Sequence, residues 1–211
     1  MAGEKKLNRA ISVSQLESMS FNELPFDGDW FDLIGKPEIK GSWLIWGESG
    51  NGKTRFALRL CKYLARFCRP AYNSMEEGAS KSLREAFREV GMNEVKGRVV
   101  LLDNEPIQEL KTRLRKRRSP DVVIIDSVQY TGLNYRDYTT LVNEFRNKLF
   151  ILISHADGKS PAGRTAKSIR YDAFVKIRIE GYRAFALSRY GGGKPFDIWP
   201  EAARKYYNED L

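Results

Sequence analysis

The chain of 211 residues has very little cysteine and histidine: it contains two cysteines and one histidine. Cys61 and Cys68 lie seven positions apart in a helix-like segment. That spacing places them on one helical face about 10 Å apart, which is too far for a disulfide. Two cysteines and His155 cannot supply the four ligands of a usual structural zinc site. The composition therefore excludes a disulfide-stapled domain and a zinc finger.

Long hydrophobic runs are also missing. No apolar stretch approaches the roughly 18 residues that a membrane-spanning helix needs. The first 20 residues lack the apolar core of a secretory signal. We therefore expect a cytoplasmic protein with no membrane partner, and the length is that of one domain or slightly more.

Acidic residues are fewer than basic ones, because 36 Lys and Arg stand against 27 Asp and Glu, a formal net charge of +9. The surplus is unevenly placed along the chain. Residues 1–40 hold five basic and seven acidic side chains, whereas residues 41–211 hold 31 and 20. We therefore predict a mildly acidic lead at 1–40 and a basic body at 41–211, and the body's charge indicates an anionic partner.

The body alternates apolar, strand-like runs with segments of helical periodicity. This alternation in the first three quarters predicts an α/β fold with a mostly parallel sheet between helices, and the strands crowded near the end predict an antiparallel edge. The expected strands are 41–47, 71–75, 98–103, 121–127, 149–154, 173–179 and 183–190, and the expected helices are 53–67, 80–91, 107–118 and 139–148.

The most specific motif lies between the first expected strand and the first expected helix, and it fits the pattern G-x-x-x-x-G-K-[ST]. Its glycines allow backbone N–H groups to point at phosphate oxygens, and the helix that follows directs its positive end at the same place. We expect Lys53 to reach the β- and γ-phosphates of ATP and the Thr54 hydroxyl to bind Mg²⁺. The residues of this nucleotide-binding loop are Gly47, Glu48, Ser49, Gly50, Asn51, Gly52, Lys53 and Thr54.

Acidic side chains follow two other expected strands. Asp126 comes after four β-branched residues, and at the carboxyl end of a parallel strand it would face the phosphate loop and share Mg²⁺ with Thr54. Glu76 is the first carboxylate after the strand 71–75, so it is the candidate base for an attacking water, with Glu77 as the reserve. The alternative is that both glutamates merely cap the helix 80–91.

Five blocks in this order, GESGNGKT, SMEEG, VVIIDSVQY, LFILISHADGKSPAGRTAKSIRYDAFVKIRI and SRYGGG, resemble the RecA-like ATPase core. Within that class the resemblance is to the RadA/Sms, DnaB-type and KaiC-type group, and it covers about residues 40–195. It implies a three-layer RecA-like P-loop fold that hydrolyses ATP to ADP and phosphate. It also implies a homo-oligomer, a ring or a filament, that acts with single-stranded DNA in recombination, replication or mobile-element processes. By the same resemblance we expect the lead 1–40 to dock on a neighbouring subunit.

The resemblance also suggests roles for individual residues. Glu76 matches the catalytic glutamate, and Ser154 and His155 match a polar sensor step at the end of the strand that follows the Asp126 strand. Arg189 matches an arginine that reaches the nucleotide of a neighbouring subunit. The lysine that normally precedes this arginine by two positions is replaced by a leucine here.

A basic segment at 157–170 matches the mobile loop that touches single-stranded DNA in this class. Its cations are Lys159, Arg164, Lys167 and Arg170, and they alternate with small residues that suit a flexible backbone along a phosphodiester chain. Two other interpretations remain open at this point. The segment is compatible with a solvated surface excursion, and with an arginine-bearing lid over a phosphorylated small molecule.

A second basic run occupies the expected helix 107–118, where Lys111, Arg115 and Arg118 would share one face. A solvated helix face and a nucleic-acid contact are both compatible with it. For the whole chain, two alternatives to a DNA-associated ATPase stay open. One is a KaiC-like nucleotide-driven switch that controls a protein partner without DNA, and the other is a small-molecule kinase.

Overall fold

The structure is a computed structural model that describes residues 10–209. Its strands form a nine-stranded sheet in the order β3-β2-β4-β5-β1-β7-β8-β9, with β6 paired to β5 alone. Neighbours from β3 to β7 are parallel, and β7, β8 and β9 are antiparallel. The predicted α/β class, with a mostly parallel sheet and an antiparallel C-terminal edge, is confirmed. The strands are β1 (Gly41–Gly47), β2 (Pro70–Ser74), β3 (Val100–Asp103), β4 (Val122–Asp126), β5 (Leu149–Asp157), β6 (Ser160–Pro161), β7 (Val175–Glu180), β8 (Arg183–Ser188) and β9 (Phe196–Asp197).

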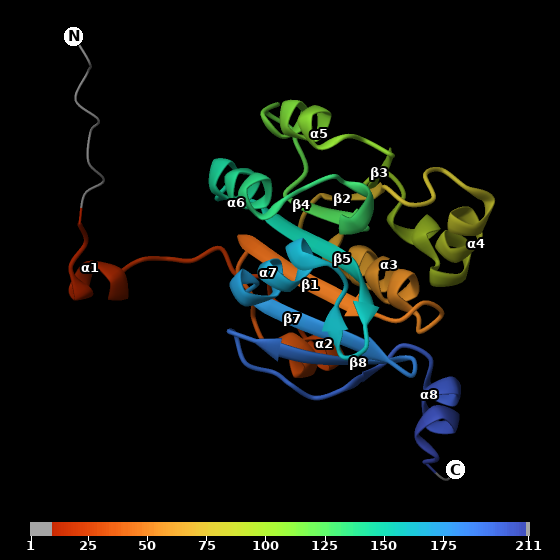
Figure 1. The fold of residues 1–211 in the computed structure, drawn as a ribbon. Coiled ribbons are helices and arrows are strands. Elements are labelled where there is room, and N and C mark those ends of the chain that lie inside the picture. Colours follow the sequence, from red (N-terminus) through yellow and green to blue (C-terminus); the bar gives the residue numbers. More distant parts are fainter. Residues whose placement is uncertain (1–9, 210–211) are drawn as a thin grey trace.

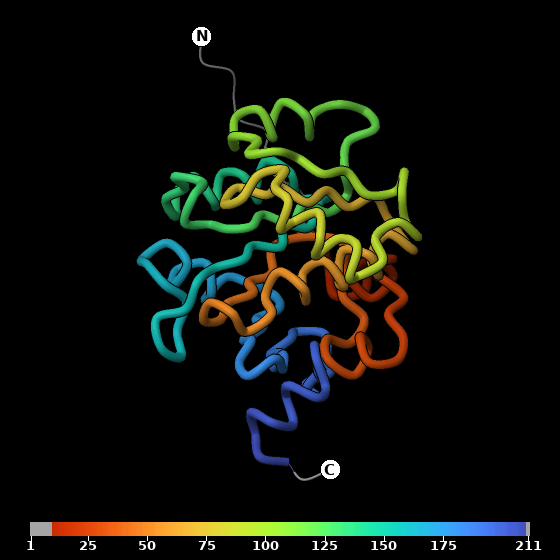
Figure 2. Tube along the Cα trace, turned by 90° about the vertical axis from the view of Figure 1, so that its right-hand side faces the viewer, coloured from red at the N-terminus to blue at the C-terminus, as the bar shows by residue number. Residues whose placement is uncertain are grey.

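Helices cover both faces of the parallel part of the sheet, which gives three layers (Figure 1). One core cluster packs side chains of α2 and α3 against the sheet, and the other packs side chains of α5, α6 and α7 against its opposite face. In both views α8 projects from the end of the molecule opposite to α5 (Figures 1 and 2). The helices are α1 (Val13–Glu17), α2 (Gly28–Ile34), α3 (Lys53–Leu64), α4 (Lys81–Val90), α5 (Ile107–Leu114), α6 (Tyr135–Glu144), α7 (Arg164–Asp172) and α8 (Pro200–Tyr207), with 3₁₀ turns η1 (Met92–Val95) and η2 (Val128–Tyr130).

The burial of each strand follows its place in the sheet. All four apolar residues of β4, 122–125, are fully buried, as a central parallel strand with helices on both faces requires. In β7, by contrast, Val175, Ile177 and Ile179 are buried, while the residues that alternate with them are only half-buried. The antiparallel edge of the sheet therefore has one face that no helix fully covers.

Part of the predicted lead belongs to the core of the body. Leu24 and Phe26 are buried there, and the Trp30 ring stacks on Phe196 of β9 with centroids 4.7 Å apart. Helix α1, by contrast, has no buried residue, and it lies away from the sheet (Figure 1). The first nine residues of the lead lie outside the described residues. Within the described part, the segment that projects from the body therefore ends near residue 22.

The second basic run departs from its prediction. Helix α5 ends at Leu114, and Pro120 follows shortly after, where it disfavours helical backbone in the residue before it. Lys111 and Arg115 both pair with Glu144 of α6, so they link two helices. Arg118 lies beyond the helix, so the predicted common face of three cations was wrong.

The segment 157–170 is folded for most of its length instead of forming an open loop. Residues Ser160–Pro161 pair back onto β5 as β6, and α7 begins at Arg164. Ala166 and Ile169 are buried, which anchors one face of α7 on the sheet. Among residues 10–209, no helix is both long enough and apolar enough to cross a membrane.

Candidate functional site

The carboxyl ends of four neighbouring parallel strands, β1, β2, β4 and β5, meet at one edge of the sheet. Strand register places Gly47 beside His155 and Ser74 beside Asp126, so the segments that follow these strands converge. A cavity of about 320 Å³ lies between them. It is lined by Ser49, Gly50, Gly52, Lys53, Thr54, Arg55, Ser74, Glu76, Glu77, Leu83, Asp126 and His155.

A larger hollow of about 810 Å³ lies between α4, η1 and the edge strand β3. Its lining contains apolar and basic side chains but no carboxylate. We therefore place the chemistry in the smaller cavity, because only there do the phosphate loop and acidic side chains face each other.

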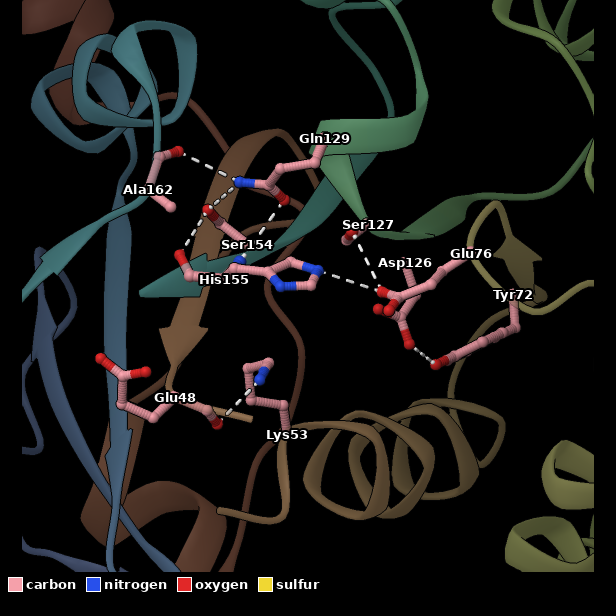
Figure 3. A network of polar contacts seen from close by, with 10 residues as sticks. All are labelled: Glu48, Lys53, Tyr72, Glu76, Asp126, Ser127, Gln129, Ser154, His155 and Ala162. Atoms are coloured by element: carbon pink, nitrogen blue, oxygen red, sulfur yellow. Dashed lines mark hydrogen bonds and ion pairs between the residues drawn. The ribbon is translucent and has the colours of Figure 1, made fainter. Parts of the chain in front are cut away.

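The phosphate loop has the backbone that its glycines predict. Gly50 and Gly52 have φ angles of 78° and 94°, which side chains rarely adopt, and Gly52 is the N-cap of α3. The Lys53 Nζ donates a hydrogen bond of 2.9 Å to the Glu48 carbonyl of the same loop (Figure 3). Burial lowers the pKa of Lys53, while the negative charges of Asp126 and Glu76 raise it. The loop thus holds a partly desolvated cation over the cavity, where an anion would compensate it.

Asp126 is the most enclosed carboxylate of the site. The Tyr72 hydroxyl, from the neighbouring strand β2, donates a hydrogen bond to Asp126 Oδ2 (Figure 3). Burial raises the pKa of Asp126, although the hydrogen bond from Tyr72 lowers it. Tyr72 was not predicted from the sequence. Its signal is a tyrosine inside a fully buried strand, because a buried hydroxyl needs a partner.

The structure separates the roles of the two adjacent glutamates. Glu76 Oε2 lies 3.1 Å from His155 Nε2 and accepts a hydrogen bond of 3.4 Å from the Ser127 hydroxyl (Figure 3). Its backbone N–H also donates to the Asp126 carbonyl at 3.1 Å. Glu77 instead accepts hydrogen bonds from the hydroxyls at the start of α4, at 2.9 Å from Ser80 and 2.5 Å from Ser82.

The capping interpretation therefore describes Glu77, whereas Glu76 points at the polar groups around the cavity. This arrangement favours Glu76 as the candidate base, whereas Glu77 stabilises the start of α4. Both side chains still line the cavity.

Gln129 links the predicted sensor step to the segment before α7. Its Nε2 donates to the Ser154 hydroxyl at 2.8 Å and to the Ala162 carbonyl at 3.1 Å, and its Oε1 accepts from the His155 N–H at 3.4 Å (Figure 3). The Ala162 N–H donates in turn to the His155 carbonyl at 2.8 Å. Gln129 was missed in the sequence, where its only signal is a polar residue on the turn after the Asp126 strand.

Arg189 does not reach the cavity of its own chain. It is exposed after β8, its guanidinium lies 4.4 Å from the centre of the Phe174 ring, and it does not line the site. A single chain therefore brings together the phosphate loop, Asp126, Glu76 and the sensor pair, and leaves Arg189 outside.

The four cations of the predicted DNA segment differ in their surroundings. Lys167 pairs with Asp157 at 3.3 Å, and the Arg170 guanidinium lies 5.0 Å from the centre of the Trp46 ring. Lys159 and Arg164 are exposed, and within residues 10–209 neither side chain makes an ion pair. Half of the predicted cations are thus engaged with the protein itself.

The donor set of the cavity suits magnesium. Within residues 10–209 there is no cluster of three or more His, Cys, Asp or Glu side chains that could hold a metal ion by itself. Mg²⁺ is usually bound through one or two protein oxygen ligands together with substrate phosphates and water. Thr54 and Asp126, which both line the cavity, fit that description.

Neither a protein-family model nor a curated protein sequence matches this chain. Many solved structures are similar in fold, and two of them serve as examples. The flagellar accessory protein FlaH from Methanocaldococcus jannaschii superposes with a TM-score of 0.60 at 16% identity, over 84% of this chain and 94% of that one. The KaiC-like protein PH0186 from Pyrococcus horikoshii OT3 gives a TM-score of 0.56 at 19% identity, over 79% of this chain and 89% of that one. Together with the strand order, these similarities show that the chain has the fold of the RecA-like ATPases.

Proposed function

We propose that this protein is a Mg²⁺-dependent ATPase that hydrolyses ATP to ADP and phosphate. The observation that carries the proposal is the shared cavity, in which Lys53, Asp126 and Glu76 come from three different strand ends and face one another. A glycine-rich turn without nucleotide chemistry does not need a half-buried carboxylate and a second, hydrogen-bonded carboxylate beside it.

The proposed reaction uses each group in a distinct way. The loop N–H groups and Lys53 hold the phosphates. Thr54 and Asp126 would hold Mg²⁺, which would supply positive charge to the triphosphate. Glu76 accepts a proton from the attacking water, whose oxygen forms the new bond to the γ-phosphorus while the bond to the β–γ bridging oxygen breaks. The contacts of Glu76 with His155 and Ser127 would restrict the positions of its carboxylate during this step.

We propose further that the working form is a homo-oligomer, a ring or a filament. Arg189 lies outside the cavity of its own chain, so only a neighbouring chain would bring it to a γ-phosphate. An arginine supplied in trans is worth roughly 10³–10⁵ in rate, so an isolated subunit should hydrolyse ATP slowly.

Single-stranded DNA is the partner that we propose for the segment around α7. Lys159 and Arg164 are exposed there, and the Gln129 contacts with Ser154 and Ala162 join this segment to the side of the cavity where the γ-phosphate would lie. A change at Ser154 that depends on the γ-phosphate would therefore be transmitted through Gln129 to the start of α7.

One alternative keeps the ATPase and replaces the DNA. The fold similarity to a KaiC-like protein is compatible with a nucleotide-driven switch that controls a protein partner. A small-molecule kinase is the remaining alternative, and it would be a monomer that transfers phosphate to an acceptor other than water.

The test is the ATPase rate and the particle size of the full chain, each measured with and without single-stranded DNA. Lys53→Ala and Glu76→Gln should abolish turnover, whereas the neighbouring Glu77→Gln should retain most of it. Unchanged turnover in Lys53→Ala would refute the site. DNA stimulation supports the DNA partner, and an oligomeric ATPase that ignores DNA supports the switch.

A further inference from the structure

The phosphate loop has a second side, opposite to the carboxylates. Glu76, Asp126 and His155 lie beyond β1 towards β5, β4 and β2, whereas β7 and β8 lie on the other side of β1. A nucleotide whose γ-phosphate faces the carboxylates must extend its α-phosphate, ribose and base away from them. The surface of this second side thus decides how a base is held.

An aromatic wall, formed by the rings of Tyr182 and Trp199, lies on this second side, and the turn between β7 and β8 joins it to the phosphate loop. The Gly181 N–H, in the turn between β7 and β8, donates a hydrogen bond of 2.8 Å to Asn51 Oδ1. A Cβ placed on Gly52 would lie 3.4 Å from Ile198 and 3.6 Å from Tyr182. Ile198 and Tyr182 therefore lie close to Gly52 of the phosphate loop, with room for little more than a methyl group between them.

Two rings and one guanidinium form the surface of the wall. The rings of Tyr182 and Trp199 lie edge to face with centroids 5.7 Å apart. The guanidinium of Arg55, directly after the loop threonine, lies 5.4 Å from the centre of the Trp199 ring, and because Arg55 also lines the carboxylate cavity it lies between the two sides of the loop. Glu89 of α4 pairs with Arg55 and holds it in place. Trp199 remains 44% exposed, which leaves much of a large apolar ring uncovered next to the loop.

The turn between β7 and β8 has an unusual backbone conformation, which its surroundings must stabilise. Gly181 and Tyr182 have φ angles of 53° and 60°, the geometry of a two-residue turn in which asparagine or glycine usually occupies both positions. A tyrosine is disfavoured in that conformation, and such residues persist where the surroundings hold them. Here the Ile198 N–H donates to the Tyr182 carbonyl at 2.8 Å, which ties the backbone of the turn to the segment before α8.

We propose that Tyr182, Trp199 and Arg55 form the subsite for the base of a purine nucleoside triphosphate. The inference rests on the proposed ATPase function and adds the residues that hold the base. Stacking on a ring or a guanidinium engages the face of a base and not its hydrogen-bonding edge. The subsite should therefore favour a large purine and discriminate less than tenfold between ATP and GTP.

The decisive comparison is between Mg²⁺–ATP and Mg²⁺–tripolyphosphate, which carries the phosphates without a base. Stacking of one base on aromatic side chains corresponds to about 5- to 150-fold in affinity. Calorimetric titration of the full chain should show ATP binding tighter than tripolyphosphate by about that factor. Trp199→Ala should reduce this ratio to near one and leave tripolyphosphate binding unchanged, and Trp199→Phe should keep most of the ratio.

A second variant separates stacking from folding. Tyr182→Asn places a residue that suits the positive φ in the turn, so it should maintain or raise the melting temperature while weakening ATP binding by about 5-fold or more. Tyr171→Ala is the control, because Tyr171 is an exposed aromatic residue on α7 outside the wall. It should change neither ligand's affinity.

The outcomes distinguish this inference from the proposed function. If ATP and tripolyphosphate bind the wild type equally, or if Trp199→Ala and Tyr182→Asn bind ATP like the wild type, the base subsite is refuted and the phosphate loop stands. If the wild type binds neither ligand, the proposed function fails and the subsite fails with it.

Discussion

Replacing Asp126 with asparagine should stabilise the free protein and at the same time remove its response to Mg²⁺–ATP. Asp126 is an enclosed carboxylate whose pKa is raised by burial, so its ionised form is disfavoured in the folded state. The asparagine amide has nearly the same shape and its oxygen still accepts the hydrogen bond from Tyr72. The substitution therefore removes a desolvated charge without opening a cavity.

The expected size of the two effects follows from the kind of site. Removing a desolvated functional charge is worth about 1 kcal/mol, which corresponds to a rise of roughly 2–4 °C in the melting temperature of a chain of this length. In the wild type, Mg²⁺–ATP at 100 times its Kd should add about 2.7 kcal/mol, or roughly 5–11 °C. Asp126→Asn should lose most of that second shift, because the amide is a poor Mg²⁺ ligand compared with a carboxylate.

The pH dependence has a definite sign. Since folding raises the pKa of Asp126 above its ordinary value of 3.8, the folded wild type binds a proton more readily than the unfolded chain. The wild type therefore gains stability from this group as the pH falls through the folded-state pKa, and the gain is complete below 3.8. Asparagine does not titrate, so the advantage of the variant should shrink between pH 7 and pH 4.

Thermal melts followed by circular dichroism, at both pH values and with and without Mg²⁺–ATP, measure all three effects. Asp103→Asn is a matched control, because Asp103 also ends a parallel strand, β3, which β2 separates from β4, but it is exposed. It should not raise the melting temperature and should keep the nucleotide shift. A lower melting temperature of free Asp126→Asn at pH 7, or an undiminished Mg²⁺–ATP shift, would refute the reasoning.

Two further predictions concern assembly and nucleic acid. The Arg189→Ala variant should bind ATP normally and hydrolyse it slowly. Mixing it with the Lys53→Ala variant should restore part of the ATPase activity, because one chain then supplies Lys53 and its neighbour supplies Arg189. A mixture as inactive as the two separate variants would contradict an arginine acting in trans. The affinity for single-stranded DNA should fall with added salt. The double variant Lys159→Ala with Arg164→Ala should reduce the slope of log K against log salt by about 1.4 per subunit, because each DNA phosphate that is no longer neutralised removes roughly 0.7 from the slope. Filter binding over a salt series measures this, and an unchanged slope would remove these two cations from the interface.

Local patterns predicted the parts of the site that depend on local geometry. The phosphate loop needs only glycines, a lysine and a hydroxyl between a strand and a helix, and all of these are adjacent in the chain. Asp126 followed from the rule that parallel strands present their carboxyl ends at one edge. The same rule brought Glu76 to this edge, while the choice between Glu76 and Glu77 required the contacts with His155 and Ser80.

Features that depend on distant contacts were not predicted. Tyr72 and Asp126 are 54 positions apart, and Gln129 and Ser154 are 25 apart, so no local periodicity reports either hydrogen bond. The aromatic residues of the lead gave no sign that Trp30 stacks on Phe196, a partner near the other end of the chain.

Net charge is the clearest case in which composition and structure point to different conclusions. The surplus of nine charges suggests a broad surface for a polyanion. In the structure, many of the cations have internal tasks: Arg183 pairs with Asp197 and Glu209 across the C-terminal edge, and Arg113 pairs with Glu105 beside α5. Cations that hold the fold together release no counterions from DNA. The affinity for nucleic acid should therefore depend on the exposed cations near α7 and on the number of subunits that present them, and not on the net charge of the chain.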